Sequence, residues 1–548
     1  MSKRKITYLY QLVFFVMLAT PSRITFAQVV PVPGNHWCYH FIDRLEAHGL
    51  LDHAITGTKP WSRQDVARTL YHVYQHHVSS LSHIEQQQLN DLLVEFADAL
   101  DVDVPALHPT RLQRVRNHPS IDRWLPDAIY PTGRHLFEWK DEQIAVFGDP
   151  VILYQHQSGK NTDVTKVTNG FALYGMWHNW LHFFVDARDN TESGGDPYQQ
   201  GNYTLPRRGF VRSTSPNVLS YDETEAGIIL TGKGVRLTYG KFKNQWGPAR
   251  SGNLILSDYA TSYDQIKFEV VHPRFVLTSI YAYLIDYVPY DWDRLLPKKY
   301  FAGHRLEISP GWRFNIGLSE TVVFKDRSFE PSYLNPMMFY RSAEHYHGSP
   351  DNALMGVDIA WRPIRNWKLY SELLIDDITT SKIGTDWYGN KWGYITGIFF
   401  VTPLTRYTFD VRLEYGRLRP YVYTHWSGAN YTHYNSTLGY WSPPNAENLF
   451  FEVNSQITRS FGIRLNGSYW RHGANWTNKN VGGNINQPFE FDENNAAFLS
   501  GVREERSEIN IVARYKVFWN WFFDFRYCYT NENSFDDHLV EVAVELRR

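Results

Sequence analysis

Short segments in which apolar and charged residues alternate fill most of the chain. In 410–415 the order is Asp, Val, Arg, Leu, Glu, Tyr, and the same alternation occurs in 266–270, 523–527 and 540–546. A period of two is typical of β-strands that bury one face. Roughly 16 to 20 such segments occur, which is the number found in large single-chain outer-membrane barrels. The pattern predicts a mainly β fold, a large barrel, for residues 144–548.

Residues 28–103 have a helical period instead, with apolar residues three and four positions apart. Two helix starts are marked by capping residues, Ser62 with Asp65 and Ser82 with Glu85. With the apolar face that precedes them, they predict three amphipathic helices. So small a helical unit is marginal by itself, so we expect it to pack on the β region.

The first residues have the features of an export signal. A basic start precedes a short apolar run, and the small residues Thr25 and Ala27 frame a cleavage position. We therefore predict that 1–27 is a signal peptide, because its apolar run is too short to span a bilayer as a helix. Residues 104–143 are rich in Pro, Arg and His and are predicted to form a linker.

The turns indicate that the apolar face of the barrel is outside. Trp stands on both sides of three tight connections, at 177–180, 361–367 and 519–521. Such turns would set the indoles at one height, as in the aromatic girdle of a membrane barrel. Exposed Trp pairs are unfavourable in water, and 16% of the chain is aromatic. An outer-membrane barrel is therefore favoured over a soluble sandwich or propeller.

With the apolar face outside, the charged face lines the lumen. Its residues carry both signs in nearly equal number, so they can pair across the lumen and brace it. A selective ion pore would show one sign. The predicted luminal charges are Arg236, Lys267, Glu269, Lys368, Glu372, Asp410, Arg412, Glu414, Arg514, Lys516, Asp524 and Arg526.

Two long predicted loops, 421–448 and 469–505, combine aromatic residues with Asn, Ser, Gly and His. Aromatic rings stack on the C–H faces of sugars and amides hydrogen-bond hydroxyls, so these loops are candidate polysaccharide contacts. The same residues can equally pack the loops. The aromatic candidates are Trp426, Tyr440, Trp441, Trp470 and Trp476.

The stretch 234–258, GVRLTYGKFKNQWGPARSGNLILSD, is the densest motif of the chain. It begins as a strand, its alternation slips at Gly240, and a turn rich in Gly, Pro and cations follows. A glycine at the slip predicts a bulge or a strained turn. Two lysines, a Trp and an Arg at the lip of a strand pair suit an anionic, ring-containing ligand. The candidate contacts are Lys241, Lys243, Trp246 and Arg250.

This motif resembles the Wzi-like capsule assembly family of Gram-negative outer-membrane proteins. The resemblance extends to W-x-Y at 37–39 and PWSRQDVA at 60–67. It implies a barrel of about 18 strands whose N-terminal helices, residues 28–103, plug it on the periplasmic side. It also implies a lectin-like, non-catalytic role in holding capsular polysaccharide at the cell surface. The matching residues are Lys241, Trp246 and Leu254, together with Gly240, Gly247, Pro248, Ser251 and Gly252, for which a structural role is expected.

Catalytic motifs are absent from the sequence. It has no Gly-rich phosphate loop, G-x-S-x-G elbow or H-E-x-x-H helix. Acidic pairs are weak evidence for a glycosidase, which needs two carboxyls at a defined separation. We expect no enzyme activity and no cofactor. The acidic pairs are Asp376 with Asp377, Asp291 with Asp293, and Asp536 with Asp537.

Two other functions stay open. One is an outer-membrane diffusion channel for oligosaccharides, and the other is a secreted glycan-active enzyme. The net charge of −2 gives no field that would attract nucleic acid. The expected partners are capsular or other surface polysaccharide, outer-membrane lipid and, in addition, polysaccharide export machinery.

Histidines and cysteines add no expected site. His36 and His40, like His72 and His76, have a spacing that suits a metal, but no carboxylate or cysteine pattern accompanies them. Solvated helix faces are therefore favoured, and no metal is expected. Two unpaired thiols are favoured over one disulfide bridge for the cysteines, which are Cys38 and Cys528.

Overall fold

The computed structural model describes residues 28–53, 55–100, 135–160, 162–194, 207–215, 217–286, 297–327, 329–402, 408–489, 494–518 and 521–546. The predicted signal peptide and most of the predicted linker lie outside these residues. Asp291 and Asp293 of the acidic pairs, and Trp519 of one Trp turn, also lie outside them.

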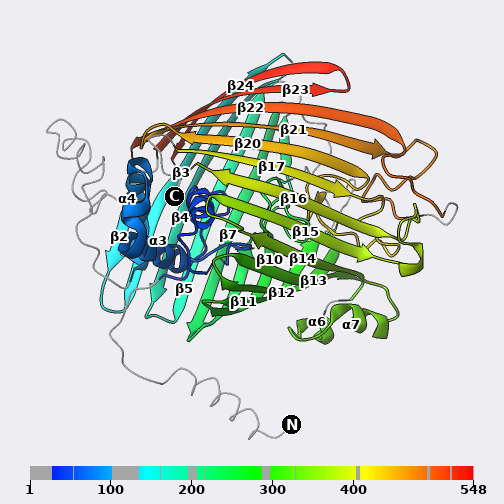
Figure 1. Ribbon diagram of the computed structural model, residues 1–548, viewed down its shortest axis with the longest axis horizontal. Helices are drawn as coiled ribbons and strands as arrows, with labels where there is room; N and C mark the ends of the chain where they lie inside the picture. The colour runs from blue at the N-terminus through cyan, green and yellow to red at the C-terminus, as the bar shows by residue number, and fades with distance from the viewer. Residues whose placement is uncertain are drawn as a thin grey trace, which may run out of the picture.

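In this part of the chain, 18 antiparallel strands pair into a closed ring, which the pairing of β24 with β3 completes (Figure 1). The ring confirms the predicted barrel. Its strands, in order, are β3 (Ile144–Gly159), β4 (Asp163–Trp177), β5 (Leu181–Gly194), β7 (Val218–Gly232), β8 (Val235–Phe242), β10 (Tyr263–His272), β11 (Phe275–Ile285), β12 (Lys298–Gly311), β13 (Phe314–Lys325), β14 (Asn352–Trp361), β15 (Trp367–Asp377), β16 (Lys391–Val401), β17 (Thr408–Leu418), β20 (Ala446–Gln456), β21 (Phe461–Ala474), β22 (Val502–Phe518), β23 (Trp521–Glu532) and β24 (Phe535–Leu546).

Short strands are added to this ring. The last residues of the predicted linker form β2 (Phe137–Lys140), which pairs with the part of β3 that β24 does not reach. The strand β6 (Arg212–Ser215) pairs with β7, and β18 (Thr432–His433) pairs with β19 (Ser436–Thr437) within a long loop.

The two ends of the ring differ in the length of their connections. One end carries tight turns and the other carries long loops, such as 419–445 and 475–501. Short turns face the periplasm and long loops face outside in outer-membrane barrels. Both described Trp turns, 177–180 and 361–367, lie at the short-turn end, as predicted, and Trp177 there is 45% exposed.

Side chains alternate between the outside of the wall and the lumen. In β14, Val357 and Ile359 are 46% and 39% exposed, whereas Asp358 between them is 8% exposed. Charged side chains are therefore luminal, as predicted, and several are deeply buried. Lys368, Glu372, Asp410, Arg412 and Glu414 are each 4% exposed or less.

Three helices make up the core of residues 28–100, which we call the head. They are α2 (Cys38–His48), α3 (Arg63–His77) and α4 (His83–Glu95). The 3₁₀ turn η1 (Val78–Ser80) lies between α3 and α4, and the 3₁₀ turn η2 (Ala97–Ala99) follows α4. Both predicted capping boxes are present, Ser62 with Asp65 and Ser82 with Glu85. None of the described helices has the length and apolarity that crossing a bilayer requires.

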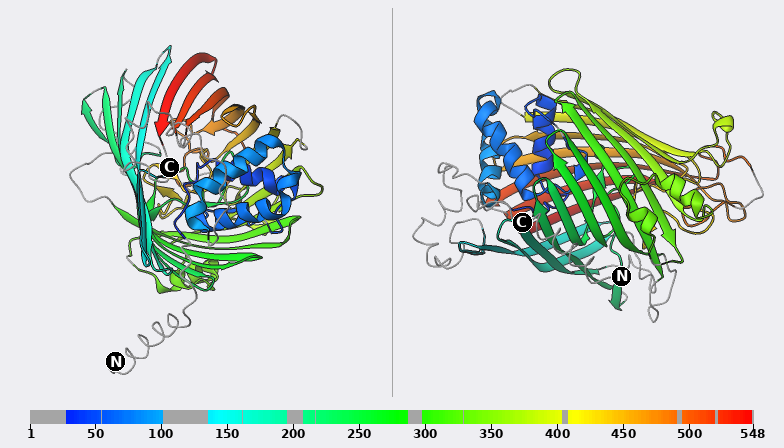
Figure 2. Two further views of the ribbon diagram at one scale, coloured as in Figure 1. Left: turned by 90° about the vertical axis from the view of Figure 1, so that its left-hand side faces the viewer. Right: turned by 90° about the horizontal axis from the view of Figure 1, so that it is seen from below.

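The head lies inside the short-turn end of the barrel (Figure 2). Glu46 of α2 pairs with Lys368 at 2.7 Å and also with Arg362. Asp43 pairs with Arg412 at 3.0 Å. Part of the mixed luminal charge thus serves to bind the head. Further pairs join Arg44 to Asp410, Asp65 to Arg236, and Asp91 to Arg459.

The connection between β13 and β14 folds back over the outside of the wall. Its helices, α6 (Pro331–Leu334) and α7 (Tyr340–Tyr346), lie outside the ring (Figures 1 and 2). Beneath them, the outward-facing His304 and Glu320 approach to 3.3 Å. Glu320 accepts hydrogen bonds from the backbone N–H groups of Tyr340 and Arg341, both at 2.8 Å. The loop thereby covers a polar pair on the outer face of the wall, where the side chains point away from the lumen.

Candidate functional site

The site is built around the motif turn, residues 243–262, which connects β8 to β10 at the long-loop end and folds into the lumen. Its strand β9 (Gln245–Trp246) pairs with β1 (Thr58–Lys59) of the head. Trp246 is 1% exposed and packs in a cluster that includes Phe301 and Tyr370 of the wall. The turn therefore faces the lumen, where it joins the head to the wall.

Glu372 of β15 binds one part of this turn. Its carboxylate accepts hydrogen bonds from the backbone N–H groups of Ala249, at 3.0 Å, and Leu254, at 2.8 Å. The side chain of Asn253 donates a third, at 2.6 Å. A buried carboxylate needs such donors. Glu372 thus fixes the path of the turn.

Glu414 of β17 binds the next part. It accepts hydrogen bonds from the backbone N–H groups of Arg250, at 2.7 Å, and Ser251, at 2.8 Å. The hydroxyl of Tyr370 donates to the same carboxylate. Two wall carboxylates therefore hold the motif by its backbone, which leaves the side chain of Arg250 available for other contacts.

Two motif glycines are required by this arrangement. Gly247 has φ +127°, and a Cβ there would lie 2.2 Å from Oε1 of Glu372. Gly252 has φ +136°, and a Cβ there would lie 3.0 Å from the ring of Tyr440. Left-handed backbone and close approach both favour glycine. Pro248 follows the first of these glycines and is half-buried.

The bulge predicted at Gly240 is wrong. The strand β8 stays in register through this residue, opposite Gly227 on one side and Gln265 on the other. A Cβ at Gly240 would lie 2.4 Å from the carbonyl oxygen of Ala226, so glycine is needed for close strand approach. The apparent slip arises because Lys241 occupies an outward position that apolar residues hold earlier in the strand.

The structure does not bring the four predicted contacts of the turn into one site. Trp246 is buried beneath the turn. Lys241, on the outward side of β8, lies opposite Asp264 of β10. Lys243 lines a cavity of about 240 Å³ that is also lined by Glu225 and by other residues of both charges. Of these four residues, only Arg250 points from the turn into the lumen, and its side chain is 42% exposed.

The lumen is packed on one side and open on the other. Lys368 and Arg412, on the packed side, have side chains that are 1% exposed. Inward-facing cations of β21–β23 are far more accessible: Arg514 and Arg526 are each 36% exposed and Arg464 is 39% exposed. The open side therefore offers accessible charged groups to a ligand.

An aromatic pair lies above this open side, near the long loops. Trp470 faces inward from β21, with its ring 6.3 Å from that of Trp441 and 5.3 Å from that of His472. The Nε1–H of Trp470 donates a hydrogen bond to Ser442 at 2.8 Å, which fixes the ring. Both indoles are half-buried, so each keeps part of its ring accessible.

The remaining aromatic candidates lie in different surroundings. Tyr440 is 2% exposed, and its hydroxyl accepts a hydrogen bond from Asn448 at 3.2 Å, so it packs the loop. Trp426 and Trp476 are 66% and 39% exposed on the long loops. Of the predicted aromatic residues, the structure brings together Tyr440, Trp441 and Trp470.

The described acidic pairs do not form catalytic pairs. Asp376 and Asp377 are successive strand residues, so their side chains point to opposite faces. Asp376 accepts a hydrogen bond from the backbone of Tyr423, whereas Asp377 contacts Arg341. Asp536 and the residue after it are likewise successive in β24. Both cysteines are free thiols, as predicted.

Four carboxyls of the head, among them Asp43 and Asp65, have pKa values below their usual range. Burial alone would raise the pKa of Asp43, but Lys368 and Arg412 beside it lower the pKa by more. Burial would likewise raise the pKa of Asp65, and Arg236 reverses the effect. A depressed carboxyl pKa stabilises the folded state above the unfolded pKa, and this contribution is lost as the pH falls through the folded value.

We therefore expect the docked head to be unchanged from neutral pH to about pH 5 and to loosen below about pH 4, where unfolded carboxyls become protonated. The measurement is hydrogen–deuterium exchange of α2 and α3, corrected for the intrinsic pH dependence of exchange. Loss of protection already between pH 7 and 5 would contradict the assignment to these carboxyls, since histidines titrate in that interval.

Comparisons with known proteins agree with this architecture. Residues 221–534, more than half of the 548-residue chain, match the family model of the capsule assembly protein Wzi. No curated protein matches the chain. A solved structure of Wzi from Escherichia coli, described as a carbohydrate-binding β-barrel involved in group 1 capsule assembly, is 13% identical. The alignment covers 95% of this chain and 99% of that one, with a TM-score of 0.58.

Two further solved structures match with lower TM-scores. OprD from Pseudomonas aeruginosa is 11% identical, with 74% of this chain and 94% of that one covered and a TM-score of 0.40. OpdK from the same organism is 10% identical, with 73% and 98% covered and a TM-score of 0.42.

Proposed function

Because the chain belongs to the Wzi capsule assembly family, we propose that this outer-membrane β-barrel is a non-enzymatic, lectin-like protein that helps to hold capsular polysaccharide at the cell surface. The Escherichia coli Wzi is described as carbohydrate-binding, and its likeness to this chain concerns the fold. For this chain, the observation that carries the proposal is the pair Trp441 and Trp470 above the open side of the lumen.

The aromatic pair supplies the stacking half of the proposed contact. A sugar ring presents apolar C–H faces that pack on an indole, and a fixed indole loses little entropy on binding. Trp470 is fixed by Ser442. Below Trp470, the inward positions of β21 carry Ser468 and Asn466, both half-buried. These polar side chains are able to hydrogen-bond sugar hydroxyls.

Two arginines supply the charged half. Arg250 and Arg464 both approach the carboxylate of Glu452, at 3.6 Å and 3.7 Å. Two cations that share one carboxylate leave a net positive charge. Since both guanidinium groups are accessible, they would suit the carboxylates of an acidic polymer such as one that contains uronate.

The other predicted residues take secondary places in this proposal. The exposed Trp426 and Trp476 would contact polymer outside the lumen. Lys243 lies among carboxylates and is a weaker candidate than Arg250. An export partner would approach the opposite, short-turn end.

Replacing both Trp441 and Trp470 by Ala is expected to weaken polysaccharide binding roughly tenfold, which corresponds to about 1.4 kcal/mol. Arg250→Glu is expected to release polymer because it reverses one of the two charges, and Lys243→Glu should have a smaller effect. The measurement is the fraction of capsular polysaccharide that stays with cells rather than in the medium.

Trp361→Ala is the matched control, because it removes an exposed Trp at the short-turn end of the wall. Each variant must also reach the outer membrane and show the gel mobility of a folded barrel. Full retention of polymer by the correctly assembled Trp441→Ala, Trp470→Ala and Arg250→Glu variants would remove these residues from the proposed contact.

A diffusion channel for oligosaccharides is the second candidate, and the accessible charges on the open side of the lumen favour it. Arg514 pairs with Asp524 there and Arg526 approaches Glu508, so the surface is mixed in charge. The two functions differ in whether the intact chain conducts, which the head deletion described in the Discussion tests.

A further inference from the structure

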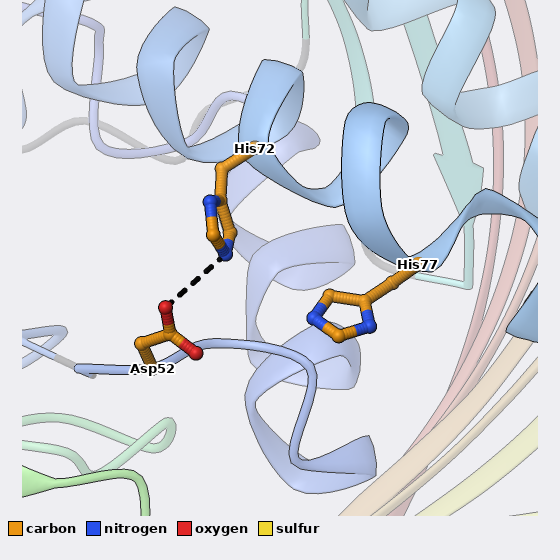
Figure 3. A group of neighbouring side chains, drawn as sticks. All are labelled: Asp52, His72 and His77. Carbon is orange, nitrogen blue, oxygen red and sulfur yellow. Dashed lines mark ion pairs between the residues drawn. The ribbon is translucent and has the colours of Figure 1, made fainter.

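Three side chains of the head that could bind a metal lie close together near the short-turn end. Asp52 comes from the segment that follows α2, and His72 and His77 come from the second half of α3 (Figure 3). One ligand atom from each lies within 4.8 Å of the others. The sequence predicted no carboxylate beside the α3 histidines, and the fold supplies Asp52.

The surroundings of His72 give a second, independent observation. Its Nε2 is buried, makes no hydrogen bond to any described residue, and lies 3.4 Å from Oδ2 of Asp52. The Nδ1 of His53, next to Asp52, is likewise buried without a hydrogen-bond partner among the described residues. The Nε2 of His72 therefore faces the carboxylate of Asp52 without a hydrogen bond, a position from which it can coordinate a cation.

We propose that Asp52, His72 and His77 bind a divalent transition metal, for which zinc is the best fit. Two imidazoles and one carboxylate are zinc ligands, and a fourth position is then available to water or to another histidine. Nitrogen ligands disfavour magnesium and calcium, which prefer oxygen. The site is therefore expected to bind a borderline-soft divalent cation, and zinc is the ion with which to test it.

The geometry requires only a small contraction. Zinc binds His nitrogen at about 2.0–2.1 Å, which puts the ligand atoms of a tetrahedral site about 3.4 Å apart. His72 and Asp52 already approach to 3.4 Å, so it is His77, within 4.8 Å of them, that must reach the same separation. The side chain of Asp52 is 75% exposed and therefore free to rotate. His76, whose ring centroid is 4.7 Å from that of His72, is close enough to complete the coordination.

A metal at this position would join two parts of the head. It would tie the segment after α2 to the end of α3, beside a cavity of about 800 Å³ between the head and the short turns. The predicted effect is a head that resists thermal unfolding better when zinc is present. This effect is independent of polysaccharide binding at the other end of the barrel.

The test is zinc binding by the full-length chain, purified in detergent without a polyhistidine tag. Calorimetry and metal analysis are expected to find an equimolar amount of zinc, and magnesium should not compete. The combined variant Asp52→Asn, His72→Ala, His77→Ala should lose this zinc and the thermal stabilisation. Cobalt bound in place of zinc should give the visible absorption of a low-coordinate site, which the variant lacks.

His83→Ala is the matched control, because it removes an exposed head histidine outside the group. It is expected to bind zinc as the parent does. The proposal is overturned if the parent binds no zinc, if the combined variant binds as much as the parent, or if His83→Ala loses binding equally.

Discussion

The intact chain is expected to carry little current in a planar bilayer, and deletion of residues 28–103 is expected to turn it into a conducting barrel. The head occupies the short-turn end and is held there by ion pairs such as Glu46 with Lys368 and Asp43 with Arg412. Without it, water enters the open side of the lumen and hydrates the wall cations that the head had paired. Barrels of about 16–18 strands leave an aqueous channel, so we expect clearly resolved unitary currents.

This experiment needs proof that the deletion variant still forms a barrel. The variant keeps residues 1–27 for export, and both proteins are compared by detergent-dependent extraction and by migration before and after boiling. Large currents from the intact chain would instead favour the diffusion channel. An assembled deletion variant that stays closed would mean that the motif turn and the long loops suffice to block the lumen.

Replacing Glu46 by Ala is expected to destabilise the docked head by about 3–5 kcal/mol, the cost of leaving a buried charge without its partner. Glu46 is 1% exposed and lies between Arg362 and Lys368, whose side chains are 0% and 1% exposed. Arg362 would then lose its carboxylate partner, and Lys368 would keep only its longer contact with Asp43, at 3.6 Å. Faster hydrogen exchange in α2, with unchanged exchange in the barrel strands, is the expected readout.

Glu142→Ala is the matched control, because this glutamate is exposed in the turn before β3. It should leave exchange in α2 unchanged. Glu46→Gln keeps an acceptor and should give an intermediate effect. If Glu46→Ala protects α2 as well as the parent does, the ion pairs of Glu46 do not anchor the head.

Much of the fold could be predicted from local patterns. A period of two is set by the strand itself, so 410–415 was assignable to a strand of the wall, and the Trp turns then indicated that its charges face inside. The capping boxes at Ser62 and Ser82 likewise depend only on residues three positions apart. These features need no knowledge of which strand lies beside which.

The candidate site depended on contacts that no local pattern contains. Glu372 binds the backbone of Ala249, 123 residues earlier, and Glu414 binds that of Arg250, 164 residues earlier. Nothing in the sequence distinguishes these two carboxylates from other luminal charges. Trp246 was predicted to contact a ligand because a Trp beside cations suits an anionic, ring-containing molecule, whereas its ring packs against the wall and is 1% exposed.

The loop with α6 and α7 covers one side of the barrel wall, so the outer surface of the barrel is not the same all the way round. On that side, Phe324 is fully buried although it occupies an outward position, and the perimeter is formed by Met337, 82% exposed, and Phe339, 55% exposed. Where the described outward residues are left uncovered, such as Val357 and Ile359 of β14, the wall itself is the perimeter. Neighbouring lipids and proteins therefore contact a different surface on each side of the barrel. Rotation of the barrel about its axis changes which of these surfaces a given neighbour contacts.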